Sequence, residues 1–139
     1  MRALAIDFGS KNIGVAVSDA LGITVRPVET IRRSSLNKDI ARLQFLLDDL
    51  EVESVVVGLP LRMDGTVGDA AEKTLRFVEQ LRAKITVPVV TQDERLTSFE
   101  AEQLMMEQGL NREQRRRRSD EVAATIILQD YLSSRRTNY

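Results

Sequence analysis

Two apolar stretches open the chain between Ala3 and Ser18, and in each of them every second residue is a large aliphatic one. The turn-forming segment 9–12 separates the stretches, so the pattern predicts a β-hairpin. A helix could pack closely over the opposite face of the second strand, which carries only the small residues Gly14, Ala16 and Ser18. The first strand ends on Asp7. A charged carboxylate in so apolar a segment costs several kcal/mol unless it meets a cation, a metal or water.

The remainder of the chain alternates between extended and helical patterns. We expect a strand over Ile23–Ile31, a helix over Leu36–Leu50, a strand at Val55–Val57, a helix over Asp69–Lys84, a strand over Val87–Gln92 and helices over Phe99–Gln108 and Ser119–Ser133. The last two helices are separated by the polar and basic segment NREQRRRRSD. No repeat or linker interrupts the series, so we expect a single domain over residues 1–139.

The connections between these elements predict the sheet. Strands joined by short turns are antiparallel, whereas strands reached through helices are parallel. Pro27 lacks a backbone donor and suits an edge strand. The prediction is therefore an α/β fold, with a five-stranded mixed sheet in the order 3-2-1-4-5 and helices on both faces.

Composition narrows the chemistry. The 139 residues are 42% hydrophobic and 29% charged, which is typical of a globular protein. Without a long apolar run or a basic leader, we expect a cytoplasmic protein with neither membrane span nor signal peptide. Cysteine and histidine are absent, which excludes disulfides, zinc–thiolate sites and Ser-His or Cys-His mechanisms. Any metal would be held by oxygen atoms, which favours Mg²⁺ or Mn²⁺, with Ca²⁺ possible.

Acidic residues end several apolar elements. Asp7 closes the first strand, Asp93 and Glu94 close the fifth, and Asp120 shares a helical face with apolar residues of the last helix. Carboxylates that converge at the carboxyl end of a sheet repel one another unless a divalent cation lies between them. The pattern therefore predicts an acidic Mg²⁺ site.

Each acid also has a purely structural interpretation. Asp120 and Glu121 could cap a helix that starts at Ser119. Asp7 could be a structural acid paired with Lys11. Asp93 or Glu94 could form a salt bridge with the neighbouring Arg95, and the sequence leaves open which of the two acids belongs to the site.

Four segments carry a resemblance to a known family: IDFGSKNIGVAVSD, VVGLPLRMDG, DERLTS and SDEVAATIIL. Together they span nearly the whole chain and resemble the YqgF family of resolvase-like ribonucleases. This family lies in the RNase H superfamily, which also holds the RuvC-type Holliday junction resolvases. The resemblance implies an RNase H-like fold, Mg²⁺-dependent phosphodiester hydrolysis and processing of the 5′ end of precursor 16S rRNA in ribosome biogenesis.

The resemblance also implies the catalytic acids and metal ligands, which are Asp7, Glu94 and Asp120. The resolvases have an acid at the end of the fourth strand, where this chain has Gly58-Leu59-Pro60. The second acid must therefore come from the DER segment. Two metal ions could activate a water and stabilise the leaving oxygen, so no histidine base is needed.

Basic and small polar residues near these acids are candidates for binding nucleic acid. The net charge is −1, yet five arginines lie between Arg112 and Arg118, so the basic character is local. Phosphates would be bound by Lys11, Arg115, Arg116, Arg117 and Arg118, with hydroxyl donors at Thr97 and Ser98. Gly58 would let the substrate backbone approach the sheet. For the arginine run, an ordinary solvated segment is the alternative.

Other functions stay open at this point. The same chemistry could cleave DNA junctions, which would require a stable dimer, whereas we expect a monomer or weak homodimer. The Asp-x-Gly turn also resembles the first phosphate loop of the actin and sugar-kinase ATPases, although these need two such domains. A third possibility is a catalytically weak RNA-binding factor that acts on ribosomal particles.

Overall fold

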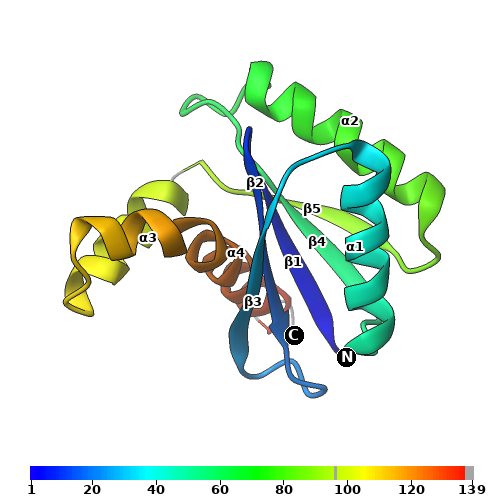
Figure 1. The fold of residues 1–139 in the computed structure, drawn as a ribbon, viewed down its shortest axis with the longest axis horizontal. Helices are drawn as coiled ribbons and strands as arrows, with labels where there is room; N and C mark the ends of the chain where they lie inside the picture. Colours follow the sequence, from blue (N-terminus) through cyan, green and yellow to red (C-terminus); the bar gives the residue numbers. More distant parts are fainter. Residues whose placement is uncertain (96, 137–139) are drawn as a thin grey trace.

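The computed structural model describes residues 1–95 and 97–136, with the side chains of residues 97–100 and 136 left aside. Its elements are β1 (Ala3–Phe8), β2 (Asn12–Ser18), β3 (Val25–Arg32), α1 (Leu36–Asp49), β4 (Ser54–Leu59), α2 (Asp69–Lys84), β5 (Val89–Asp93), α3 (Thr97–Glu107) and α4 (Arg112–Arg136) (Figure 1). None of the helices in these residues is both long and apolar enough to cross a membrane.

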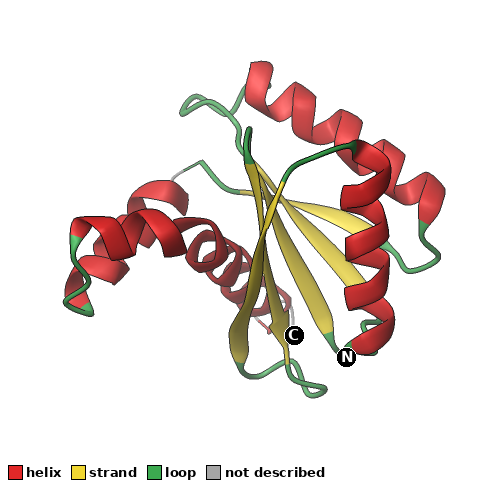
Figure 2. Ribbon diagram, in the orientation of Figure 1, coloured by secondary structure: helices red, strands yellow, loops and turns green. Residues whose placement is uncertain are grey.

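The sheet has the predicted topology. Its strand order is β3-β2-β1-β4-β5 (Figure 2). β2 runs antiparallel to both β1 and β3, while β4 runs parallel to β1 and to β5. Pro27 lies on the edge strand β3, next to an irregularity in the pairing with β2. The sequence-based prediction of the mixed sheet is confirmed.

Helices cover both faces of this sheet, and the two faces differ in side-chain size. α1 and α2 lie on one face, whereas α3 and α4 lie on the other (Figure 1). The large aliphatic residues of the hairpin pack toward α1 and α2 in the main core. The opposite face presents the small residues on which α4 packs, in a second cluster of Ala3, Ala5, Ala16, Val56, Ala124, Ile127 and Leu128.

The backbone of α4 lies directly against the sheet at Gly14. A Cβ atom placed on Gly14 would lie 2.0 Å from the backbone carbonyl oxygen of Asp120. No side chain larger than hydrogen fits there, because the obstacle is helix backbone. The small-residue face of β2 therefore fixes where Asp120 lies over the sheet.

The start of the last helix differs from the prediction. α4 begins at Arg112 rather than Ser119, so the arginine run is helical. The cause is a reciprocal cap. The Gln114 backbone N–H donates to Asn111 Oδ1 and the Asn111 N–H donates to Gln114 Oε1, both at 2.9 Å. Because α4 continues through Ser119, the idea that Asp120 and Glu121 only cap a helix is wrong.

Candidate metal and nucleic-acid site

Asp7 lies near the end of the central strand β1, on the face that α4 covers. Its partner in the neighbouring strand is Gly14. Burial raises the pKa of Asp7 from 3.8 to about 6, and the negative charge of Asp120 adds to the rise. No ion pair with Lys11 is present among the described residues, so the structural interpretation of Asp7 finds no support.

Asp120 meets Asp7 from α4. Its backbone rests on Gly14, and its carboxylate accepts a hydrogen bond from the side chain of Asn12, at the start of β2. Burial raises the pKa of Asp120, while the hydrogen bond from Asn12 opposes that rise. Two partly desolvated carboxylates thus face each other where β1, β2 and α4 meet.

Glu94 follows β5 and lies at the end of the neighbouring strand β4. Its backbone N–H donates to the carbonyl oxygen of Leu59 at 3.0 Å. Its side chain is buried, and it shares a hydrogen bond with the carboxyl group of Asp130 on α4. Burial raises the pKa of Asp130. Asp93, by contrast, is exposed and forms an ion pair with Arg95 at 3.1 Å. Of the two acids of the DER segment, Glu94 is therefore the better candidate.

The carboxylate oxygens of Asp7 and Asp120 are suitable ligands for a hard divalent cation. Mg²⁺ in proteins is commonly held by one or two carboxylates, with waters and substrate phosphates completing its shell. Asp7 and Asp120 supply such a pair, and a cation between them would relieve their repulsion. Within the described ranges, no three acidic side chains are close enough to hold one ion together. The role of Glu94 as a ligand stays a prediction.

Gly58 is surrounded by protein atoms. A Cβ atom on Gly58 would lie 2.4 Å from Cδ1 of Ile127 and 3.4 Å from Cγ of Glu94. Its small size therefore serves the packing of α4 and places Glu94 over β4. Contact between Gly58 and a substrate stays a prediction, and this packing does not favour it.

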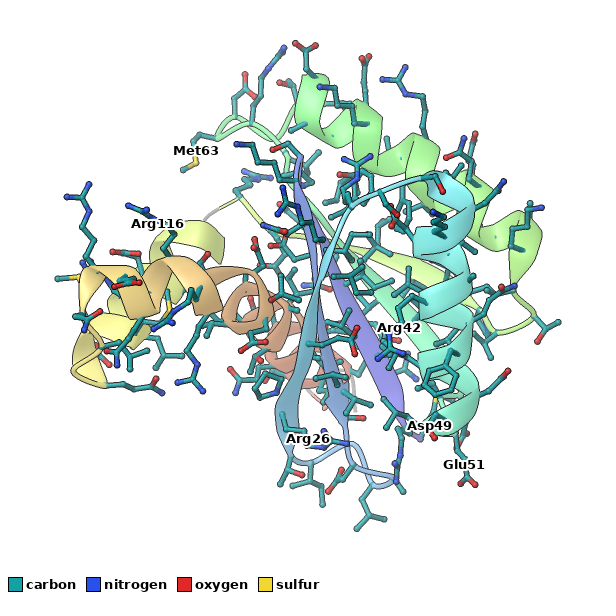
Figure 3. The ribbon with its side chains drawn as sticks, in the orientation of Figure 1. Arg26, Arg42, Asp49, Glu51, Met63 and Arg116 are labelled. Atoms are coloured by element: carbon teal, nitrogen blue, oxygen red, sulfur yellow. The ribbon has the colours of Figure 1, made fainter. Side chains whose placement is uncertain are left out.

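The basic candidates fall into two groups. The Arg115 guanidinium donates to Glu102 at 2.7 Å and to the Leu110 carbonyl at 2.9 Å, so it links α4 to α3 and to the connection between the two helices. Arg116, Arg117 and Arg118 are exposed, and Arg116 projects from the part of α4 that extends beyond the sheet (Figure 3). Thr97 and Ser98 begin α3, but their side chains lie outside the described ones.

Lys11 lies in a basic pocket that sequence reasoning did not find. The pocket has a volume of about 540 Å³ and is lined by Ser10, Lys11, Asn12, Arg32 and Arg33. Asn12 connects it to the acid pair, because the same side chain donates to Asp120. The basic doublet at the end of the third strand was the available signal, but only the pairing of β3 with β2 brings it beside the turn.

The fold defines the structural class of the protein. It has the RNase H-like fold of the resolvase-type nucleases, and it resembles two solved members. The first is T. thermophilus RuvC in complex with a Holliday junction substrate, with a TM-score of 0.63 and 20% identity over 98% of this chain and 96% of that one. The second is the fowlpox virus resolvase in complex with Holliday junction DNA, with a TM-score of 0.59 and 12% identity over 96% and 98%.

The family follows from sequence similarity. The model of RuvX, described as Holliday junction resolvase, matches residues 1–134, and the chain belongs to this family. Among curated relatives, a "Putative pre-16S rRNA nuclease" of Clostridium acetobutylicum is 48% identical over 134 residues, which are 96% of this chain and 99% of the relative. A protein of the same name in Desulforudis audaxviator is 43% identical over 137 residues, which are 99% and 97%. The resemblance expected from the four segments is confirmed.

Proposed function

We propose that this chain is a divalent-metal-dependent nuclease that hydrolyses phosphodiester bonds in RNA, with precursor 16S rRNA as its substrate. The observation that carries the proposal is the convergence of Asp7 and Asp120 at the carboxyl end of β1. The names of the curated relatives support the choice of substrate. A cytoplasmic location belongs to the same proposal, because that substrate is an intracellular RNA.

The residues divide the work as follows. Asp7 and Asp120 would hold Mg²⁺ or Mn²⁺, which when bound supplies charge neutralisation at the phosphate and a water of lowered pKa. Asn12 and Gly14 hold the Asp120 carboxylate and backbone in place. Glu94 completes the set of acids at the next strand end. Lys11 and the exposed arginines of α4 would bind the sugar-phosphate backbone.

Substitutions that keep side-chain size test the proposal. Asp7→Asn, Asp120→Asn and Glu94→Gln are each expected to lower Mg²⁺-dependent cleavage of a precursor 16S rRNA fragment on the order of 100-fold or more. Affinity for the same RNA, measured in EDTA, should not fall. Asp49→Asn on the exposed end of α1 serves as the matched control. Cleavage by the Asp7→Asn protein at the rate of the unaltered chain would refute the assignment.

A second candidate has specific support, since the RuvX family is described as Holliday junction resolvase. Turnover of a four-way DNA junction and of the rRNA fragment by the same preparation separates the two activities. Symmetric junction cutting would also require two copies of the site, which sedimentation of the chain can detect. If neither substrate is cut while RNA binding survives neutralisation of all three acids, the chain is instead an RNA-binding assembly factor.

A further inference from the structure

A second pocket lies beside the basic pocket of the β1–β2 turn. Its volume is about 280 Å³, and its lining includes Phe8, Arg33, Lys73, Arg76 and Phe77. Arg33 lines both pockets, so they are neighbours separated by one side chain. Figure 1 shows why residues so distant in sequence meet here: the β1–β2 turn and the starts of α1 and α2 lie at the same end of the sheet.

The Arg33 side chain lies between the two pockets and is held in place by hydrogen bonds and an aromatic contact. Its Nη1 donates to the carbonyl oxygens of Gly9 at 3.0 Å and Ser10 at 3.2 Å. Its guanidinium carbon lies 4.3 Å from the centroid of the Phe8 ring. The other side of that ring stacks on Phe77, with centroids 4.2 Å apart and planes at 11°. Since Phe8 already has these two partners, neither pocket offers its ring as a stacking surface for a base.

The remaining cations around the pockets are exposed. Lys11 and Arg32 line the first pocket, and Lys73 and Arg76 line the second. None of these four side chains forms an ion pair with another described residue. Neither lining contains an acidic residue. Clustered cations without counter-charges favour a polyanion whose charges are spaced along a chain.

We infer that the two pockets form a track for the sugar-phosphate backbone of a single nucleic-acid strand, which leaves the acid pair past Asn12 and crosses the end of the sheet toward α2. Lys11 and Arg32 bind phosphates close to the acids, and Lys73 and Arg76 bind phosphates farther along. The inference rests on the proposed nuclease function, because it extends the substrate site of that function. It assigns the α1–α2 side of the sheet to the substrate, in addition to the arginines on α4.

The salt dependence of binding tests the track. For single strands, the logarithm of the binding constant falls with the logarithm of salt concentration by about 0.7 for each phosphate contact. Lys73→Gln with Arg76→Gln should therefore reduce the slope by about 1.4, and Lys11→Gln with Arg32→Gln should reduce it by the same amount. The probes are fluorescein-labelled oligouridylate and oligodeoxyuridylate of about 12 nucleotides. They are titrated in EDTA with the Asp7→Asn protein as background.

A control with the same loss of charge lies away from the track. Arg26 is at the opposite end of the sheet from the β1–β2 turn (Figure 3), and Lys84 is the last residue of α2. Both are exposed. The Arg26→Gln with Lys84→Gln protein should keep the slope of its background. Thermal unfolding of all variants verifies that the fold is intact.

The outcomes separate the track from the nuclease proposal. The inference is overturned if a track variant shows the same salt slope as the control variant, whether both slopes stay unchanged or both fall by the same amount. A loss seen with RNA but not with DNA overturns backbone recognition. If the nuclease proposal fails while the track is correct, the slopes still change and no substrate is cut. If only the track fails, cleavage still depends on Asp7.

Discussion

Replacing Asp7 by Asn should stabilise the metal-free protein. In the fold the pKa of Asp7 is raised from 3.8 to about 6, first by burial and then by the charge of Asp120. The native state therefore holds the proton more tightly than the unfolded chain. As the pH rises from about 4 through about 6, the free energy of unfolding falls because the unfolded chain loses the Asp7 proton before the folded protein does. Above about pH 6 the folded protein carries the full free-energy cost of the ionised Asp7 carboxylate.

The size of this cost follows from the two pKa values. The difference between about 6 and 3.8 corresponds to about 3 kcal/mol, at about 1.4 kcal/mol for each pKa unit. The Asn side chain is neutral at every pH and has nearly the same shape. In EDTA at pH 7.5 the Asp7→Asn protein should thus gain about 3 kcal/mol in its free energy of unfolding. At pH 4 the gain should shrink to less than about 1 kcal/mol.

Urea denaturation followed by circular dichroism at these two pH values measures both quantities. Asp49→Asn, which changes an exposed carboxylate, should leave the free energy of unfolding within about 0.5 kcal/mol. Added Mg²⁺ should raise the stability of the unaltered protein by about 2.7 kcal/mol at a hundred times its dissociation constant, and should do little for Asp7→Asn. A loss of stability in Asp7→Asn at pH 7.5, or a gain that is as large at pH 4, would refute the reasoning.

Three further substitutions examine α4 and its contact with β2. Gly14→Ala should destabilise the fold by about 1–3 kcal/mol, because the added Cβ displaces the backbone of Asp120. It should also lower cleavage more than the control Leu46→Ala, which changes a buried core residue on the α1 face. Urea denaturation and cleavage assays compare the two variants. Arg115→Gln should cost up to about 1 kcal/mol of stability because it removes a partly exposed ion pair. Arg116→Gln should leave stability unchanged but reduce the salt slope of RNA binding by about 0.7, as fluorescence titration would show.

The sheet could be predicted from the sequence because its topology depends on connection length. Short turns after β1 and β2 allow only antiparallel neighbours, and helical crossovers lead to parallel ones. The small residues of β2 predicted that a helix packs closely on this strand, and in the structure that helix is α4, which lies over Gly14. The pairing of Asp7 with Asp120 was predictable for the same reason, since both positions lie on the face that this helix covers.

The start of α4 was placed too late, at Ser119, because the apolar stripe begins only there and the acids after Ser119 resemble the first turn of a helix. The first turns of α4 are polar and charged, and they extend beyond the sheet (Figure 1), so they carry no apolar stripe. The informative signal was the spacing of Asn111 and Gln114, which is that of a capping box. This error matters for function, because a helical run sends its arginines to different sides and lets Arg115 pair with Glu102.

Tertiary contacts, which no local sequence pattern reveals, determine which acidic and basic residues lie at the site. Asp93 and Glu94 are adjacent residues that both carry a carboxyl group, yet Asp93 forms a surface ion pair and Glu94 is buried against Gly58 and α4. Likewise, the doublet Arg32 and Arg33 becomes part of a basic pocket only because β3 pairs with β2 and returns to the β1–β2 turn. Asp7 is thus positioned by the end of β1, Asp120 by the packing of α4 on β2, and the cations of the basic pocket by strand pairing. The acid pair and the basic pocket meet at Asn12, which lines the pocket and donates to Asp120. That shared side chain is the structural reason to treat phosphate binding and acid chemistry as one site.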